Sequence, residues 1–334
     1  MAKFTIVLTS YNHESYIRQA IESVLNQTFS DLKLVIIDDA SKDNSLQIIK
    51  EYAAKDDRIE PYMRYENGGV NASVQSGIAK VRTELFGQLD SDDALRNDAV
   101  EIAYNEHLAN PEVGFMYSGQ ILCDEKLEPV KEGGNRPLKE GESFLDTPMG
   151  QWRTYKFSYF AKTEGIDLDM PYVEDLDSIY KMEEVGSVKM IEQPLYYIRQ
   201  LPNSICRAPR TSNLGKLSRA VAKLKAVARR CGYSPTIQWE VGDHPISQAI
   251  NKMVNDKEYP LHKEDFVLLS GVIINAVRTG QLKYGSELKT LNPLSLATQI
   301  NLEQFYKMLE VIMPGDKDYL EPPDWKRSKD LSEG

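Results

Sequence analysis

Short runs of consecutive apolar residues alternate with segments of helical apolar spacing between residues 4 and 93. The runs at 4–8 and 34–37 suit buried strands, a third short strand is expected to include Tyr62 and Met63, and 85–89 predicts a fourth strand. The segments with helical spacing lie between them, at 14–25, 41–49 and about 71–80. This alternation predicts an α/β fold in which a mostly parallel sheet is flanked by helices.

The pattern loosens after residue 110. Residues 113–122 and 188–198 predict further strands, and the stretch 131–148, rich in Gly, Pro and charge, predicts a long loop. Strand signals stop near residue 210, and the tail from Pro314 is charged and expected to be loosely held. We therefore expect a sheet domain at 1–210 and a mainly helical region at 211–334.

Polar residues cluster where the predicted strands end. The clusters are Thr9-Ser10-Tyr11, Asp38-Asp39 and Asp90-Ser91-Asp92. Parallel strands end at a common edge of their sheet, and ligands of such sheets bind there. We expect these clusters to meet at one edge, although they are far apart in sequence.

The Asp90-Ser91-Asp92 turn carries alternate carboxylates after an apolar strand. Two such oxygens can hold one hard cation, and a bound diphosphate can supply the remaining ligands. The alternative is a solvated acidic turn. Placement directly after a buried strand favours the metal site.

The Asp38-Asp39 pair and Tyr11 suit a nucleotide. A carboxylate at a strand end can accept hydrogen bonds from a base imide or a ribose hydroxyl, and Tyr11 can stack on a planar base. The alternatives are an N-cap for the helix that starts near Ser41, for one of the two aspartates, and a packed turn aromatic for Tyr11.

Five segments in order resemble the family 2 glycosyltransferases of the GT-A fold over residues 3 to about 207. They are Thr9-Ser10-Tyr11-Asn12, Ser23 to Thr28, Val35 to Asp43, Asn67-Gly68-Gly69 and Leu89 to Asp93. The resemblance implies a GT-A glycosyltransferase domain at 1–210. It implies that Thr9, Tyr11 and Asp39 hold the nucleotide base, usually uracil, that Asp90 reaches the ribose, and that Asp92 holds Mn²⁺ or Mg²⁺ at the diphosphate.

Glu174-Asp175 resembles the Glu-Asp motif that carries the catalytic base of inverting members. A carboxylate there can take the proton of an acceptor hydroxyl as its oxygen attacks the anomeric carbon. Asp175 is our first choice and Glu174 the reserve. The alternative is an acidic cluster that the dipole stabilises at a helix N-terminus.

Two departures from the family pattern concern the donor. Ser73-Val74-Gln75 stands where an Ala-Arg-Asn pattern is usual, and Leu201 stands where the late segment often has His. Arg199, in that late segment, is a candidate contact for the diphosphate, with a surface ion pair as its alternative.

Composition limits the classes of partner and the location that we expect. The chain of 334 residues has a net charge of -10, which disfavours nucleic acid as a partner. Its three cysteines are far apart and form no CxxC pair, so a zinc knuckle is not expected and a reducing cytoplasm is the simplest location. No apolar run is long enough for a transmembrane helix. The sequence is compatible with a homo-oligomer.

The segment 216–230 is basic, with no acidic residue and an apolar stripe. It suits a membrane-surface helix near a lipid-linked acceptor, but a helix packed on the acidic domain is favoured because the stripe lacks aromatics.

Three functions remain. An inverting transferase that moves sugar from a UDP-sugar to a glycan, lipid-linked or other acceptor is preferred. A nucleotidylyltransferase ranks low because Ser10 to His13 offers no glycine-rich phosphate loop. A non-catalytic scaffold that binds sugar or nucleotide is disfavoured by Asp92 and Asp175.

Overall fold

The structure is a computed structural model that describes residues 2–139, 143–144, 150–168 and 174–201, together with 222, 226 and 229. The chain divides into two units, Met1–Arg207 and Ala208–Gly334, and every element named below belongs to the first. The predicted helical region at 211–334 lies almost wholly outside the described residues. The predicted boundary at residue 210 stays a prediction.

The first half of the domain alternates strands and helices as predicted. Its elements are β1 (Phe4–Ser10), α1 (Ile17–Leu25), β2 (Leu32–Asp38), α2 (Ser45–Ala53), β3 (Ile59–Met63), α3 (Gly69–Ile78) and β4 (Leu85–Asp90). β1 pairs in parallel with β2 and β4, and β2 pairs in parallel with β3. These strands form the parallel half of the sheet.

The second half makes the sheet mixed. Its elements are β5 (Ala94–Leu95), α4 (Ala99–Ala109), β6 (Val113–Cys123), β7 (Pro129–Glu132), β8 (Arg153–Lys156), α5 (Phe157–Phe160), α6 (Glu174–Val185) and β9 (Ser187–Arg199). The strand order is β3-β2-β1-β4-β8-β6-β9-β5, with β7 paired to β6. β8 runs antiparallel to both β4 and β6, whereas β6 and β9 are parallel.

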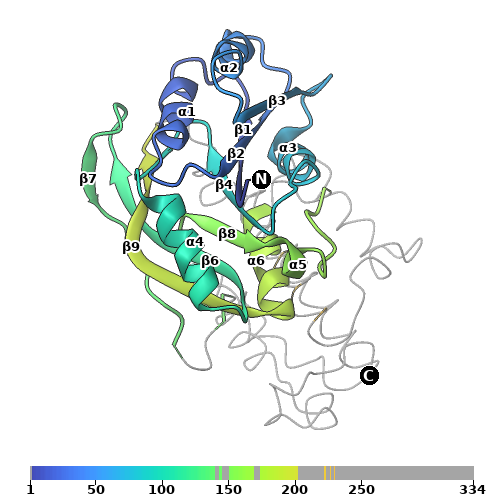
Figure 1. Ribbon diagram of the computed structural model, residues 1–334, viewed down its shortest axis with the longest axis vertical. Helices are drawn as coiled ribbons and strands as arrows, with labels where there is room; N and C mark the ends of the chain where they lie inside the picture. The colour runs from blue at the N-terminus through green and yellow to red at the C-terminus, as the bar shows by residue number, and fades with distance from the viewer. Residues whose placement is uncertain are drawn as a thin grey trace, which may run out of the picture. The chain divides into compact units, whose positions relative to one another are not determined.

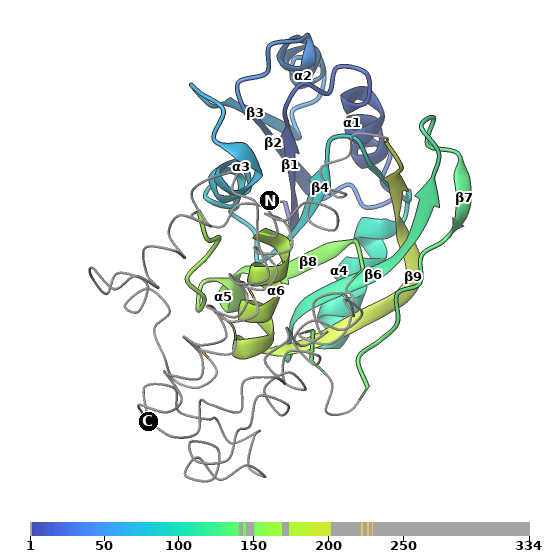
Figure 2. The same ribbon diagram turned by 180° about the vertical axis from the view of Figure 1, so that it is seen from behind.

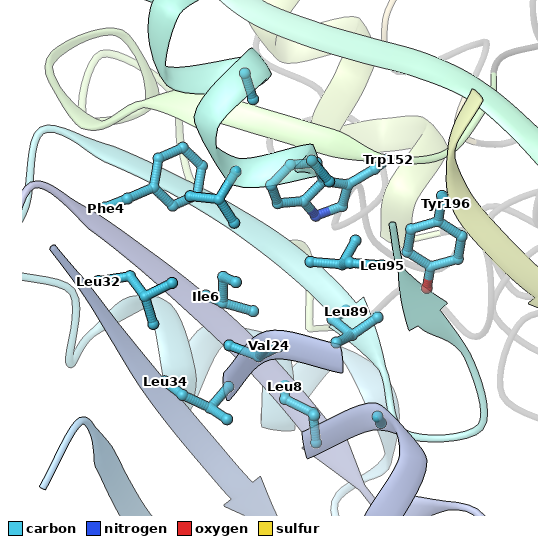
Figure 3. Close-up of a cluster of buried hydrophobic side chains, with 14 of the residues drawn as sticks. Phe4, Ile6, Leu8, Val24, Leu32, Leu34, Leu89, Leu95, Trp152 and Tyr196 are labelled. Carbon is cyan, nitrogen blue, oxygen red and sulfur yellow. The ribbon is translucent and has the colours of Figure 1, made fainter. Parts of the chain in front are cut away.

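Helices cover both faces of the sheet (Figure 1). α4 lies in front of the sheet in Figure 1 and behind it in Figure 2, where α6 comes to the front. One core contains alternate residues of β1, among them Phe4, Ile6 and Leu8, with apolar residues of α1, α2 and α4. Figure 3 shows Trp152, the residue before β8, beside Phe4 within this core. The sequence pattern therefore assigned the buried strands β1, β2 and β4 correctly.

The other face is covered by α3, α5 and α6. A Cβ added at Gly77 of α3 would lie 2.3 Å from Val7 Cγ1, so this helix sits against β1 at a distance that only glycine permits. Farther along, Phe86 stacks on Tyr155 at 4.8 Å between ring centroids, and Phe160 of α5 meets both edge-on. Among the described residues, no helix is long and apolar enough to cross a membrane.

Candidate functional site

The predicted polar clusters lie side by side at one edge of the sheet. Thr9 is paired with Asp90 of β4 on one side and with Ile37 of β2 on the other. Ser10 is paired with Asp38. The parallel half of the sheet therefore brings the three clusters together, as predicted.

The loops after β1 and β2 are fastened to each other. The Asn12 N–H donates to Ser41 Oγ at 3.0 Å, and the Lys42 N–H donates to Asn12 Oδ1 at 2.7 Å. Asn12 and Ala40 both have left-handed φ, 54° and 59°, which asparagine tolerates and alanine rarely adopts. These bonds fix the backbone around Tyr11, whose side chain is 39% exposed.

Asp38 and Asp39 have different surroundings. Asp38 Oδ2 accepts the Ser41 N–H at 2.9 Å, so Asp38 supports the turn after β2. Asp39 is buried and accepts the N–H groups of Gly68 and Gly69 at 3.0 and 2.8 Å. Arg64 Nε lies 2.9 Å from Asp39 Oδ1. Asp39 thus ties the end of β2 to the start of α3, and its contact with a nucleotide base stays a prediction.

The Asp90-Ser91-Asp92 turn is held from two sides. The Asp90 N–H donates to the Tyr196 hydroxyl on β9 at 3.1 Å. Ser91 Oγ lies 2.7 Å from His13 Nδ1 in the loop after β1. Asp92 stays partly exposed while its neighbours Ser91 and Asp93 are buried. The turn therefore presents Asp92 from a fixed backbone.

Arg199 is buried behind this turn. Its Nε donates to the Asp92 carbonyl, its Nη1 to the Glu125 carbonyl and its Nη2 to Gln19 Oε1, at 2.7, 2.7 and 2.6 Å. The guanidinium lies 4.8 Å from the Tyr16 ring centroid. Arg199 does not form a surface ion pair, because it is only 3% exposed and its guanidinium donates to neutral acceptors. Its contact with a diphosphate stays a prediction that this packing does not favour.

Asp175 lies in the first turn of α6, which begins at Glu174. Asp175 Oδ2 lies 3.3 Å from Nη1 of the buried Arg153 on β8, and Asp175 Oδ1 accepts the Leu176 N–H at 2.8 Å. The second contact fits the alternative of a helix N-terminal carboxylate. The side chain of Glu174 lies outside the described residues.

The charges at this edge form one cluster. Burial raises the pKa of Asp90, and the negative charges of Asp92 and Asp175 raise it further, whereas Arg153 and His13 lower it. Asp175 approaches this edge through its ion pair with Arg153 of β8, the strand beside β4. The predicted base and the predicted Asp-x-Asp turn share one electrostatic environment.

The metal prediction rests on Asp90 and Asp92. Among the described residues, no group of three or more His, Cys, Asp or Glu is placed to hold a metal ion. Carboxylate oxygens nonetheless suit Mn²⁺ or Mg²⁺, and Mg²⁺ sites commonly combine one or two carboxylates with substrate phosphates. The repulsion among Asp90, Asp92 and Asp175 is also of the kind that a cation relieves. The carboxylate oxygens of the turn therefore suit a metal site whose remaining ligands come from a bound substrate.

A short segment after α5 joins α3 to α6. Asn71 Nδ2 of α3 donates to the Asp167 carbonyl at 2.7 Å, and the Ile166 N–H donates to Gln75 Oε1 at 3.3 Å. From the other side, Lys181 Nζ of α6 donates to the Gly165 carbonyl at 2.8 Å. Gln75, which departs from the family pattern, therefore has a partner in this segment.

His13 and Arg153 belong to the charged edge but were not predicted from the sequence. His13 follows the first strand directly, so its place in a strand-end loop was a usable signal. Arg153 offered none, because β8 is short, carries polar residues and finds its partners on distant elements. Its role becomes visible only in the folded chain.

A family model matches the part of the chain that carries this edge of the sheet. The family model described as glycosyl transferase family 2 matches residues 5–157, which include β1 to β8 and the Asp-x-Asp turn. The N-terminal unit belongs to glycosyl transferase family 2. This agrees with the family indicated by the strand-end motifs.

Curated relatives are much longer than the matched segment. A chondroitin synthase of Escherichia coli is 30% identical over 193 residues, which are 58% of this chain and 28% of that protein. A hyaluronan synthase of Pasteurella multocida is 28% identical, with 58% and 20% covered. The chain thus spans less than a third of the length of these relatives.

A solved structure supports the fold. Staphylococcus aureus TarS 1-349 in complex with UDP-GlcNAc aligns with a TM-score of 0.51 at 15% identity, covering 80% of this chain and 83% of that one. At this identity the likeness shows the fold alone. The predicted GT-A α/β architecture is confirmed, with a sheet that is parallel from β3 to β4 and mixed beyond.

Proposed function

We propose that this chain is an inverting glycosyltransferase that moves a sugar from a nucleotide sugar to a hydroxyl group of an acceptor. The observation that carries the proposal is that Asp175 pairs with Arg153 of β8, the strand beside β4, whose end carries the Asp90-Ser91-Asp92 turn, in a family 2 domain. Direct displacement with inversion requires the departing diphosphate and the attacking hydroxyl on opposite sides of the anomeric carbon. Two separately positioned acidic groups meet that need.

The donor is proposed to be UDP-linked. Thr9, Tyr11 and Asp39 would hold the base, and Asp90 the ribose. TarS is solved with UDP-GlcNAc, whereas a mannosyltransferase from Pyrobaculum calidifontis is solved with GDP-Man and Mn²⁺, at a TM-score of 0.51 and 14% identity over 95% of this chain and 84% of that one. The experiment must therefore include both classes of nucleotide.

Asp92 would hold Mn²⁺ or Mg²⁺. A bound divalent cation would offset the charge that develops on the departing diphosphate. Asp92 suits this task because its carboxylate stays partly exposed, while the Arg199 guanidinium fixes its backbone carbonyl.

Asp175 is proposed as the base, with Glu174 as the reserve. Asp175 would accept the proton of the acceptor hydroxyl while that oxygen forms the new bond to the anomeric carbon and the bond to the diphosphate breaks. Attack from the face opposite the diphosphate inverts the anomeric configuration. A positioned base of this kind contributes about 10²–10⁴-fold in rate.

The acceptor is proposed to be a glycan or a lipid-linked sugar, and the setting is proposed to be the cytoplasm. Contact with a membrane surface would use residues 216–230, of which the structure describes only 222, 226 and 229.

The test is a panel of UDP- and GDP-sugars with Mn²⁺, scored by release of nucleoside diphosphate and by transfer to candidate glycans. We expect release that depends on one donor, that is lost in Asp92→Ala and Asp175→Asn, and that persists in Asp31→Asn, a matched change at an exposed ion pair. NMR of the product should show an inverted anomeric centre. A protein that binds donor but releases nothing with any acceptor supports the scaffold alternative instead.

A further inference from the structure

We infer that Arg153 is a positioning residue that orients Asp175 for proton transfer. The inference rests on the proposed function, because it assigns a role in the same reaction. It adds a residue that no strand-end motif contains.

The place of Arg153 in the sheet is unusual for an arginine. β8 lies between β4 and β6, inside the sheet, and Arg153 is paired with Tyr117 of β6. The residue is 5% exposed. A guanidinium cannot lose its charge in proteins, and burying it is costly unless carboxylates or other acceptors compensate. A buried arginine on a central strand therefore needs a specific partner.

One partner is an acidic group from another element. Nη1 lies 3.3 Å from Asp175 Oδ2 at the start of α6. β8 also lies beside β4, whose end carries Asp90. The Asp90-Ser91-Asp92 turn at that strand end carries two further carboxylates, and His13 contacts its Ser91 from the loop after β1. Arg153 thus supplies a positive charge beside carboxylates that would otherwise repel one another.

The guanidinium is itself held in place. Its Nε donates to Gln151 Oε1 at 3.0 Å. α6 is anchored independently by Lys181, whose Nζ donates to the Gly165 carbonyl at 2.8 Å and pairs with Asp177 of the same helix at 2.6 Å. With both groups anchored, the rigid planar fork of Arg153 can hold the Asp175 carboxylate through one ion-pair contact, Nη1 to Oδ2 at 3.3 Å, and a flexible lysine would hold it less firmly.

The contact between Arg153 and Asp175 predicts that a substitution of Arg153 lowers kcat and leaves donor affinity nearly unchanged. Arg153→Met should lower kcat by about 10²-fold, since misplacement of a reacting group by about 1 Å can cost that much. Donor affinity should stay within about 3-fold, because the inferred partner acts on the acceptor. Arg153→Lys keeps the charge and loses the fork, so it should recover only part of kcat.

A double-mutant cycle gives the decisive readout. If Arg153 acts through Asp175, then Arg153→Met should reduce the residual kcat of Asp175→Asn by less than about 3-fold. A merely structural role would instead multiply the two losses. Arg58→Met, which breaks a partly buried pair with Asp56, is the matched control and should leave kcat unchanged.

The outcomes separate the two claims. Multiplicative losses in an active enzyme overturn the role of Arg153 and leave the proposed function standing, as does full activity of Arg153→Met. If Arg153→Met does not bind donor, the cycle is run with Arg153→Lys, and multiplicative losses there again overturn the inference. A wild-type protein that transfers sugar from no donor overturns the proposed function and the inference with it.

Discussion

A buried histidine shows how strongly single residues of this domain depend on their surroundings. His107, near the end of α4, is 1% exposed, and its Nε2 lies 3.0 Å from Thr154 Oγ1 on β8. Burial, helped by the positive charge of Lys156, lowers the pKa of His107 from 6.5 to about 3. The folded domain therefore needs this imidazole neutral.

This histidine predicts a pH-dependent stability. Because its pKa is lower in the folded chain, the unfolded chain binds more protons between pH 6.5 and pH 3. The stabilisation is complete above pH 6.5 and is lost as the pH falls toward 3, at up to about 1.4 kcal/mol per pH unit. Urea unfolding at pH 7.5, 6 and 5 should show a shallower loss for His107→Gln than for wild type. Parallel curves for the two proteins would contradict this account.

The Asp38-Asp39 pair separates two roles within two residues. Asp39→Ala removes the acceptor of the Gly68 and Gly69 N–H groups and the partner of Arg64, so we expect a loss of about 1.5–3 kcal/mol in unfolding free energy. We also expect Asp39→Ala to weaken nucleotide binding more than Asp38→Ala. Calorimetric titration with UDP on both variants measures this. Equal UDP affinities would remove Asp39 from the nucleotide site.

At the scale of elements, the sequence predicted the strands whose hydrophobic pattern is local. The buried strands β1, β2 and β4 carry continuous apolar runs, and their extents agree with prediction to within about two residues. β8 was missed because its polar residues are satisfied by distant partners: Arg153 by Asp175, Thr154 by His107, and Lys156 by the Asn110 carbonyl. No periodicity encodes such pairs, which exist only once the sheet has formed.

A buried ion pair within α6 makes this helix sensitive to substitution of Lys181. This lysine and Asp177 are 5% and 1% exposed, and Lys181 Nζ also reaches the Gly165 carbonyl. Lys181→Met leaves a buried carboxylate without its nearest cation, so we expect a loss of about 3–5 kcal/mol. Lys189→Met, at an exposed pair with Glu106, should cost less than about 1 kcal/mol.

Urea unfolding of both lysine variants at pH 7 provides the comparison. Similar losses in the two proteins would mean that burial does not set the strength of the Asp177–Lys181 pair.

At the scale of the whole molecule, the candidate site joins residues from Thr9 to Arg199 at one edge of a mixed sheet. The parallel half could be placed from sequence, because strand ends of a parallel sheet share an edge. The approach of Asp175 to that edge rested on family resemblance alone, and Arg153, which holds it there, was not foreseen. The chain has a net charge of -10, and the edge gathers several of its carboxylates, so an anionic donor must overcome repulsion to bind.

That repulsion leads to the last prediction, that UDP binds tightly only with a divalent cation. At 100 times its dissociation constant, UDP with Mn²⁺ should stabilise the protein by about 2.7 kcal/mol. For a domain of this size that corresponds to a rise of about 5–10 °C in Tm. EDTA should abolish most of the shift, because Asp90, Asp92 and the diphosphate then meet without a counter-charge. Asp92→Ala should also lose the shift while keeping its own Tm near that of wild type, since Asp92 is partly exposed. Asp31→Ala should retain the full shift and the full response to EDTA. If UDP binds equally well with Mn²⁺ and with EDTA, Asp92 does not hold a metal, and the charged edge must accommodate the diphosphate through protein cations instead.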